Sequence, residues 1–121
     1  MAALAVGLEL DVPFDRAARA LASYTGVARR LQLKGEAAGV RVYDDYGHHP
    51  TEIRVTAEAA RLLVNGSGGK VWILFQPHRY SRTNLLRDAF GSAFAAADGV
   101  VLTDIYPAGE APIAGVSGRM V

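Results

Sequence analysis

Residues 42–53, with the sequence VYDDYGHHPTEI, mark the end of a strand and the start of a helix. Apolar residues alternate with others through Val40 and Val42, which predicts a strand that ends near Asp45. Pro50 suits the first turn of a helix, where its missing N–H leaves no hydrogen bond unmade. Carboxylates, phenols and imidazoles surround Gly47 between the two elements. Because open α/β sheets bind ligands beyond the carboxyl ends of their strands, this junction is a candidate binding site.

Helices and apolar strands alternate from this junction to residue 104. The helix from Pro50 to Val64 repeats apolar residues on one face, and the unbroken apolar run 71–75 predicts a strand buried on both faces. A second helix, capped by Ser81 or Thr83, and a strand at 99–104 follow. The apolar helix positions are Ile53, Ala57, Ala60 and Val64, then Leu86, Phe90 and Phe94. The order β-α-β-α-β over residues 40–104 predicts a parallel sheet with right-handed crossovers.

The N-terminal part of the chain predicts helices at 2–10 and 15–24 and a pair of short strands at 30–36 and 40–45. The fold class is therefore α/β, with part of a doubly wound parallel sheet that two helices precede along the chain. Three parallel strands are too few for a finished doubly wound domain, which has five or six. We therefore expect two units, residues 1–25 as the tail of one domain and residues 26–121 as an incomplete second domain, within a larger protein.

Composition excludes several classes of protein. Half of the 121 residues are hydrophobic, the net charge is +1, and there is no cysteine. The sequence has no run of basic residues that would predict a nucleic-acid partner. No apolar stretch approaches the roughly 20 residues that span a bilayer. His48 and His49 lack the further ligands of a metal site. We expect a cytoplasmic protein with no metal site of its own.

A second polar cluster, residues 76–83 (QPHRYSRT), follows the apolar run 71–75. Arg79 and Arg82 stand three residues apart where a helix is predicted to begin, so they are expected to share a face near its positive end. Two guanidinium groups there can hold a carboxylate. The alternative is a solvated basic helix start. His78 and Tyr80, which flank Arg79, favour the anion site.

Asp45 has two interpretations. A carboxylate at a strand end can accept hydrogen bonds from a ribose diol, or it can cap its own loop. Gly47 would let a flat group approach the backbone, and His48 is expected to hydrogen-bond a ligand or a loop carbonyl. No phosphate loop of the G-x-x-x-x-G-K-[ST] type occurs in the chain. Nothing in this sequence can therefore hold a triphosphate and its Mg²⁺ unaided.

The two clusters, with their spacing, resemble the C-terminal region of the Mur ligases, the ATP-dependent enzymes that build the peptidoglycan stem peptide. The segments that carry the resemblance are residues 26–32 (GVARRLQ), 44–52 (DDYGHHPTE), 75–83 (FQPHRYSRT) and 104–113 (DIYPAGEAPI). The resemblance implies that residues 1–25 end a central ATPase domain and that residues 26–121 begin the Rossmann-like C-terminal domain. The phosphate loop and the Mg²⁺ ligands would then lie in the missing central domain.

The resemblance also implies a reaction and residue roles. It is strongest to the branch that joins L-alanine to UDP-N-acetylmuramate through an acyl phosphate. Arg30 and Asp45 would contact ATP, and Tyr46 and His48 would border both ATP and the incoming alanine. His78, Arg79 and Arg82 would bind alanine. The resemblance implies no catalytic residue within the segment. The segment is expected to be inactive alone, because the phosphate loop, the Mg²⁺ ligands and the UDP-sugar domain are missing. The alternatives are a murein-peptide recycling ligase, which shares the Asp-Asp-x-x-His-His-Pro run but lacks the HRYSR pattern, a non-catalytic nucleotide-binding remnant, and an unrelated Rossmann-like binding domain.

Overall fold

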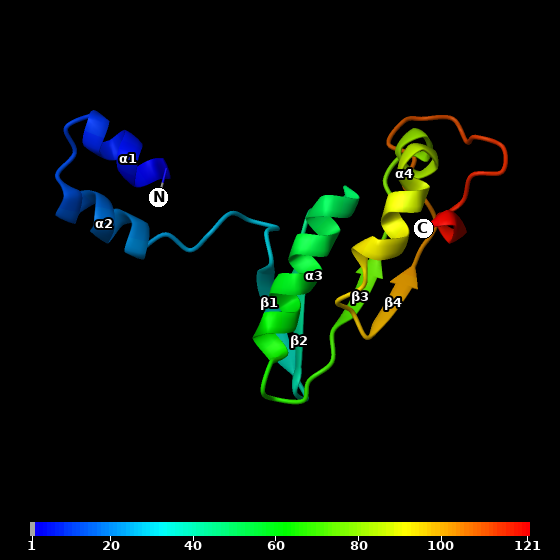
Figure 1. Ribbon diagram of the computed structural model, residues 1–121, viewed down its shortest axis with the longest axis horizontal. Coiled ribbons are helices and arrows are strands. Elements are labelled where there is room, and N and C mark those ends of the chain that lie inside the picture. Colours follow the sequence, from blue (N-terminus) through cyan, green and yellow to red (C-terminus); the bar gives the residue numbers. More distant parts are fainter. Residues whose placement is uncertain (1) are drawn as a thin grey trace.

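The N-terminal helices stand apart from the rest of the chain in the computed structural model, which describes residues 2–121 (Figure 1). Helices α1 (Ala2–Glu9) and α2 (Phe14–Ala22) form a hairpin, and an extended segment connects it to the strands. Pro13 precedes α2 as its N-cap residue. Neither helix has a buried residue, and apolar side chains such as Leu10 and Phe14 are exposed. The assignment of this hairpin to a preceding domain stays a prediction.

Strands β1 (Gln32–Ala37) and β2 (Val40–Asp44) form an antiparallel hairpin. Ala38 and Gly39 connect them with φ values of 48° and 76°. Two successive positive φ values twist a two-residue turn in the sense that paired strands require. The pair of short strands expected from the sequence is therefore confirmed.

Helix α3 (Pro50–Val64), strand β3 (Trp72–Phe75), helix α4 (Tyr80–Ala93) and strand β4 (Gly99–Leu102) follow, and a short 3-10 turn, η1 (Gly118–Met120), comes last. Strands β3 and β4 pair in parallel. The apolar faces of α3 and α4 meet β3 in a core of Ile53, Phe75, Phe90 and Ala93. The ring of Phe75 lies 5.7 Å from that of Phe90. The helical faces and the α/β class predicted from the sequence are confirmed.

The predicted three-stranded parallel sheet is wrong in one respect. Strand β2 pairs only with β1, so the described residues form two separate two-stranded sheets. A groove with a volume of about 880 Å³ separates β2 from β3, and α3 lines it as well. The helix therefore connects the two strands without bringing their edges into hydrogen-bonding distance.

Strand β3 is buried on one face only, which corrects the expectation of burial on both. Phe75 is buried, but Trp72 and Leu74 are 67% and 74% exposed. Side chains alternate between the two faces of a strand. Helices α3 and α4 pack on the face of β3 that carries Phe75. Within residues 2–121, no helix covers the face that carries Trp72.

Candidate functional site

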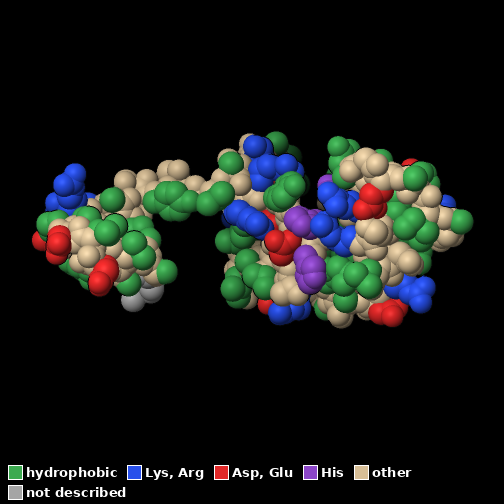
Figure 2. Space-filling view, turned by 90° about the horizontal axis from the view of Figure 1, so that it is seen from above, with side chains coloured by type: hydrophobic (Ala, Val, Ile, Leu, Met, Phe, Trp, Pro, Cys, Tyr) green, Lys and Arg blue, Asp and Glu red, His purple; other side chains and the backbone are tan. Residues whose placement is uncertain are grey.

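The two polar clusters meet at the carboxyl ends of β2 and β3. The ring centroids of His48 and His78, one from each loop, are 6.0 Å apart. On this face of the molecule, histidine side chains lie among arginine or lysine and acidic side chains (Figure 2). The structure therefore brings together the residues that the sequence placed at two successive strand ends.

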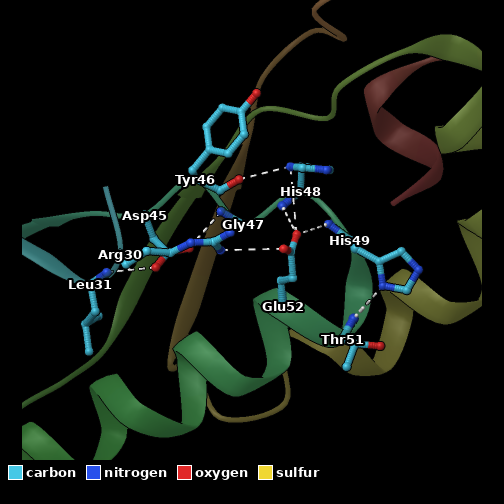
Figure 3. Close-up of polar contacts among 9 residues, drawn as sticks. All are labelled: Arg30, Leu31, Asp45, Tyr46, Gly47, His48, His49, Thr51 and Glu52. Atoms are coloured by element: carbon cyan, nitrogen blue, oxygen red, sulfur yellow. Dashed lines mark hydrogen bonds and ion pairs between the residues drawn. The ribbon is translucent and has the colours of Figure 1, made fainter. Parts of the chain in front are cut away.

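Asp45 anchors the first loop to the chain before β1 (Figure 3). Its Oδ2 accepts a hydrogen bond from the backbone N–H of Leu31 at 2.8 Å, and its Oδ1 accepts one from the N–H of Gly47 at 2.7 Å. This geometry supports the loop-capping interpretation. Each carboxylate oxygen has a second lone pair, so Asp45 can still accept a ligand hydroxyl. A Cβ on Gly47 would lie 2.8 Å from Asp45 Oδ1, which explains the glycine there.

Glu52, which the sequence reasoning missed, organises the loop before α3 (Figure 3). Its Oε2 accepts hydrogen bonds from the backbone N–H groups of His48 and His49, each at 3.1 Å, and its Oε1 contacts Arg30 Nη1 at 3.5 Å. The His48 N–H is the main cause that holds the pKa of Glu52 below its ordinary value. The signal was available, since a glutamate three residues after a helix cap is typical of a capping box.

The adjacent histidines point in different directions (Figure 3). His49 is the N-cap of α3, and its Nδ1 accepts a hydrogen bond from the Thr51 N–H at 3.2 Å. His48 turns the other way, with its Nδ1 3.0 Å from the carbonyl oxygen of Tyr46. Of the two, only His48 faces the second polar loop.

Only part of the group expected at the nucleotide lines a small hollow beside the first loop. Arg30, Asp45 and Glu52 line a cavity of about 320 Å³. Tyr46 is 48% exposed and borders His48, with ring centroids 5.3 Å apart. The guanidinium carbon of Arg29 lies over the Tyr46 ring, 4.8 Å from its centroid. Arg30, Asp45, Tyr46 and His48 therefore form one contiguous group.

In the second loop, His78 lies between α4 and the loop after β4. Arg82 Nη1 is 3.4 Å from His78 Nδ1, and the Tyr106 ring centroid is 5.3 Å from that of His78. Burial is the main cause that lowers the pKa of His78, and the positive charges of Arg82 and Arg79 lower it further. The imidazole is therefore neutral at pH 7. Because guanidinium groups only donate, His78 Nδ1 is the acceptor and Nε2 carries the hydrogen.

The start of α4 differs from the prediction. The helix begins at Tyr80, so Arg79 precedes it as the N-cap residue, with a φ of 74°, and does not share a helical face with Arg82. Neither Ser81 nor Thr83 is the cap. The Thr83 hydroxyl donates to the Arg79 carbonyl oxygen at 2.8 Å. Within residues 2–121, no carboxylate forms an ion pair with either guanidinium.

The described residues hold no group of three or more His, Asp or Glu side chains that could bind a metal ion. None of the described helices is both long and apolar enough to cross a membrane.

Several known proteins resemble this chain over most of its length. The family described as Mur ligase, glutamate ligase domain, matches residues 29–119. The UDP-N-acetylmuramate–L-alanine ligases of Mycolicibacterium smegmatis and Streptomyces coelicolor are 52% and 54% identical over the whole chain. The chain spans 25% and 26% of their lengths. The crystal structure of a UDP-N-acetylmuramate–alanine ligase from Thermotoga maritima matches 85% of the chain, and 22% of its own, at 30% identity and a TM-score of 0.71. A murein peptide ligase from Psychrobacter arcticus matches 82% of the chain, and 20% of its own, at 25% identity and a TM-score of 0.58.

Proposed function

The chain belongs to the Mur ligase family, and on that premise we propose that the complete protein joins L-alanine to UDP-N-acetylmuramate with ATP. The observation that carries the proposal is the meeting of two loops. One lies beside the hollow that Arg30 and Asp45 line, and the other carries two guanidinium groups that form no ion pair with a carboxylate within residues 2–121. Identities of 52% and 54% to alanine ligases support alanine as the amino acid.

Arg79, Arg82 and His78 bind and orient alanine in this proposal. A guanidinium fork suits a carboxylate because its N–H groups donate in parallel. Neutral His78 accepts at Nδ1 from Arg82, which leaves its Nε2–H to donate to the same carboxylate or to a substrate oxygen. A carboxylate held in this way fixes the direction of the alanine amine, and such orientation lowers the barrier to attack.

Arg30, Asp45, Tyr46 and His48 bind the nucleotide in this proposal. Asp45 accepts a ribose hydroxyl with its remaining lone pairs, Tyr46 offers an exposed ring, and Arg30 offers positive charge at the hollow. ATP supplies the phosphate that turns the sugar carboxylate into an acyl phosphate, which the amine then attacks with loss of phosphate. The Mg²⁺ that accompanies ATP is expected to be held outside this chain, as is the phosphate loop.

The test is an assay of phosphate release by the complete protein. UDP-N-acetylmuramate and ATP are supplied with either L-alanine or a peptide that begins with L-alanine. We expect turnover with L-alanine and little with the peptide. Turnover only with the peptide would make the protein a murein-peptide recycling ligase, and turnover with neither would refute the proposed function.

We expect residues 1–121 alone to be inactive, because the segment carries neither a phosphate loop nor a group of metal ligands among its described residues. The second candidate for this segment is a non-catalytic nucleotide-binding remnant, favoured by the hollow lined by Arg30 and Asp45. Equilibrium binding of ATP to the segment distinguishes a remnant from an inert piece. We place the complete enzyme in the cytoplasm, where ATP and UDP-linked sugars are available.

A further inference from the structure

Helix α4 takes its N-terminal cap from a distant loop. Its N-cap residue, Arg79, makes no side-chain capping hydrogen bond. Instead, Glu110 Oε2 accepts from the backbone N–H of Ser81 at 3.0 Å, and its Oε1 accepts from the Ser81 hydroxyl at 2.6 Å. Glu110 follows Ser81 by 29 residues. Free N–H groups at a helix start need such partners, so this carboxylate fastens the loop after β4 to the start of α4.

Backbone hydrogen bonds align the two loops before Glu110 is reached. The N–H of Tyr106 donates to the carbonyl oxygen of Pro77 at 2.8 Å, and the N–H of Arg79 donates to that of Tyr106 at 2.8 Å. A turn through Ala108 and Gly109, with φ values of 51° and 87°, then brings Glu110 back toward α4. The parallel pairing of β3 and β4 thus continues as a clamp, which we define as residues 105–110.

The clamp contacts the residues that we assign to alanine. Arg79 has a φ of 74°, which a residue with a side chain rarely adopts unless its surroundings impose it. Two elements impose it here, since its N–H is held by Tyr106 and its carbonyl oxygen by Thr83. The Tyr106 ring also packs on His78. The clamp therefore fixes the backbone that aims His78 and Arg79, and the helix start that carries Arg82.

We propose that Glu110 is a positioning residue for the amino-acid substrate: it caps α4 through Ser81 and so keeps His78, Arg79 and Arg82 in the geometry that binds a carboxylate. This inference rests on the proposed function. Both oxygens of Glu110 accept hydrogen bonds from Ser81, so its negative charge is directed at the helix start, where it is stabilised.

The experiment measures kcat and the KM values for L-alanine and ATP in the complete enzyme. Glu110→Ala should raise the KM for L-alanine about tenfold or more, because small misplacements of binding groups have large effects, and should leave the KM for ATP unchanged. Glu110→Gln should raise the KM for L-alanine less, since the amide oxygen of glutamine still accepts one of the two hydrogen bonds. Asp88→Ala is the control, because that side chain lies on the same helix and is 95% exposed.

The outcomes separate the two proposals. A wild-type enzyme without L-alanine-dependent turnover refutes the proposed function. An active wild type whose Glu110 variants keep the normal KM for L-alanine refutes the positioning role. If Glu110→Ala lowers the melting temperature too far for kinetics, Ser81→Ala removes only the 2.6 Å hydrogen bond. A selective rise in the KM for L-alanine in that variant supports the inference, and equal changes in both KM values, or none, overturn it.

Discussion

Asp45→Ala should destabilise the domain as well as weaken nucleotide use. The substitution removes the acceptors of the Leu31 and Gly47 N–H groups, which now donate at 2.8 Å and 2.7 Å. Hydrogen bonds to charged groups contribute about 1.5–3 kcal/mol each. The two hydrogen bonds share one half-buried carboxylate, so we expect the free energy of unfolding to fall by about 2–4 kcal/mol, which is less than their full sum. In a domain of roughly 150–250 residues this lowers the melting temperature by about 4–16 °C.

Thermal unfolding of the complete protein, paired with ATP kinetics, measures both effects. Asp45→Asn keeps one acceptor oxygen and should fall between wild type and Asp45→Ala. Asp44→Ala is the matched control, because it removes only an exposed ion pair with Arg29 and should cost less than about 1 kcal/mol. Equal melting temperatures for the Asp44 and Asp45 alanine variants would refute the anchoring role. A destabilised Asp45→Ala with unchanged ATP kinetics would instead refute the ribose role.

Three further predictions concern the same loops. Gly47→Ala should lower the melting temperature, because the new Cβ would lie 2.8 Å from Asp45 Oδ1. Gly35→Ala is the control and should leave the melting temperature unchanged, because no atom lies within 4 Å of its new Cβ. Similar melting temperatures for both variants would contradict this packing argument. Arg82→Ala should raise the KM for L-alanine about tenfold or more while sparing that for ATP, and Arg82→Lys should do so less; equal rises in both would count against the assignment. The lowered pKa of Glu52 means that its stabilisation is complete above its ordinary pKa of 4.5 and is lost as the pH falls through the lower value. The melting-temperature difference between wild type and Glu52→Gln should therefore shrink from pH 7 to pH 3, and a constant difference would contradict the capping role.

Local patterns determined the helices and strands of this chain. Apolar spacing in residues 50–64 and the run at 71–75 identified α3 and β3, because each period reports which side chains can be buried together. The strand ends then followed from the first polar residues beyond each run. The sequence also placed a polar cluster at each of two successive strand ends, which contain His48 and His78, but their approach to 6.0 Å was found only in the structure.

The tertiary structure alone decided which groups pair across the chain. Periodicity says which face of an element is buried, but it does not name the partner, and so it could not show that β2 pairs only with β1. Nor could it show that Asp45 accepts from Leu31 or that Glu110 caps α4 through Ser81. These contacts join residues 14 and 29 positions apart. These contacts form because packing of the core brings the two loops of each pair together. The spacing of residues along the sequence therefore cannot predict them.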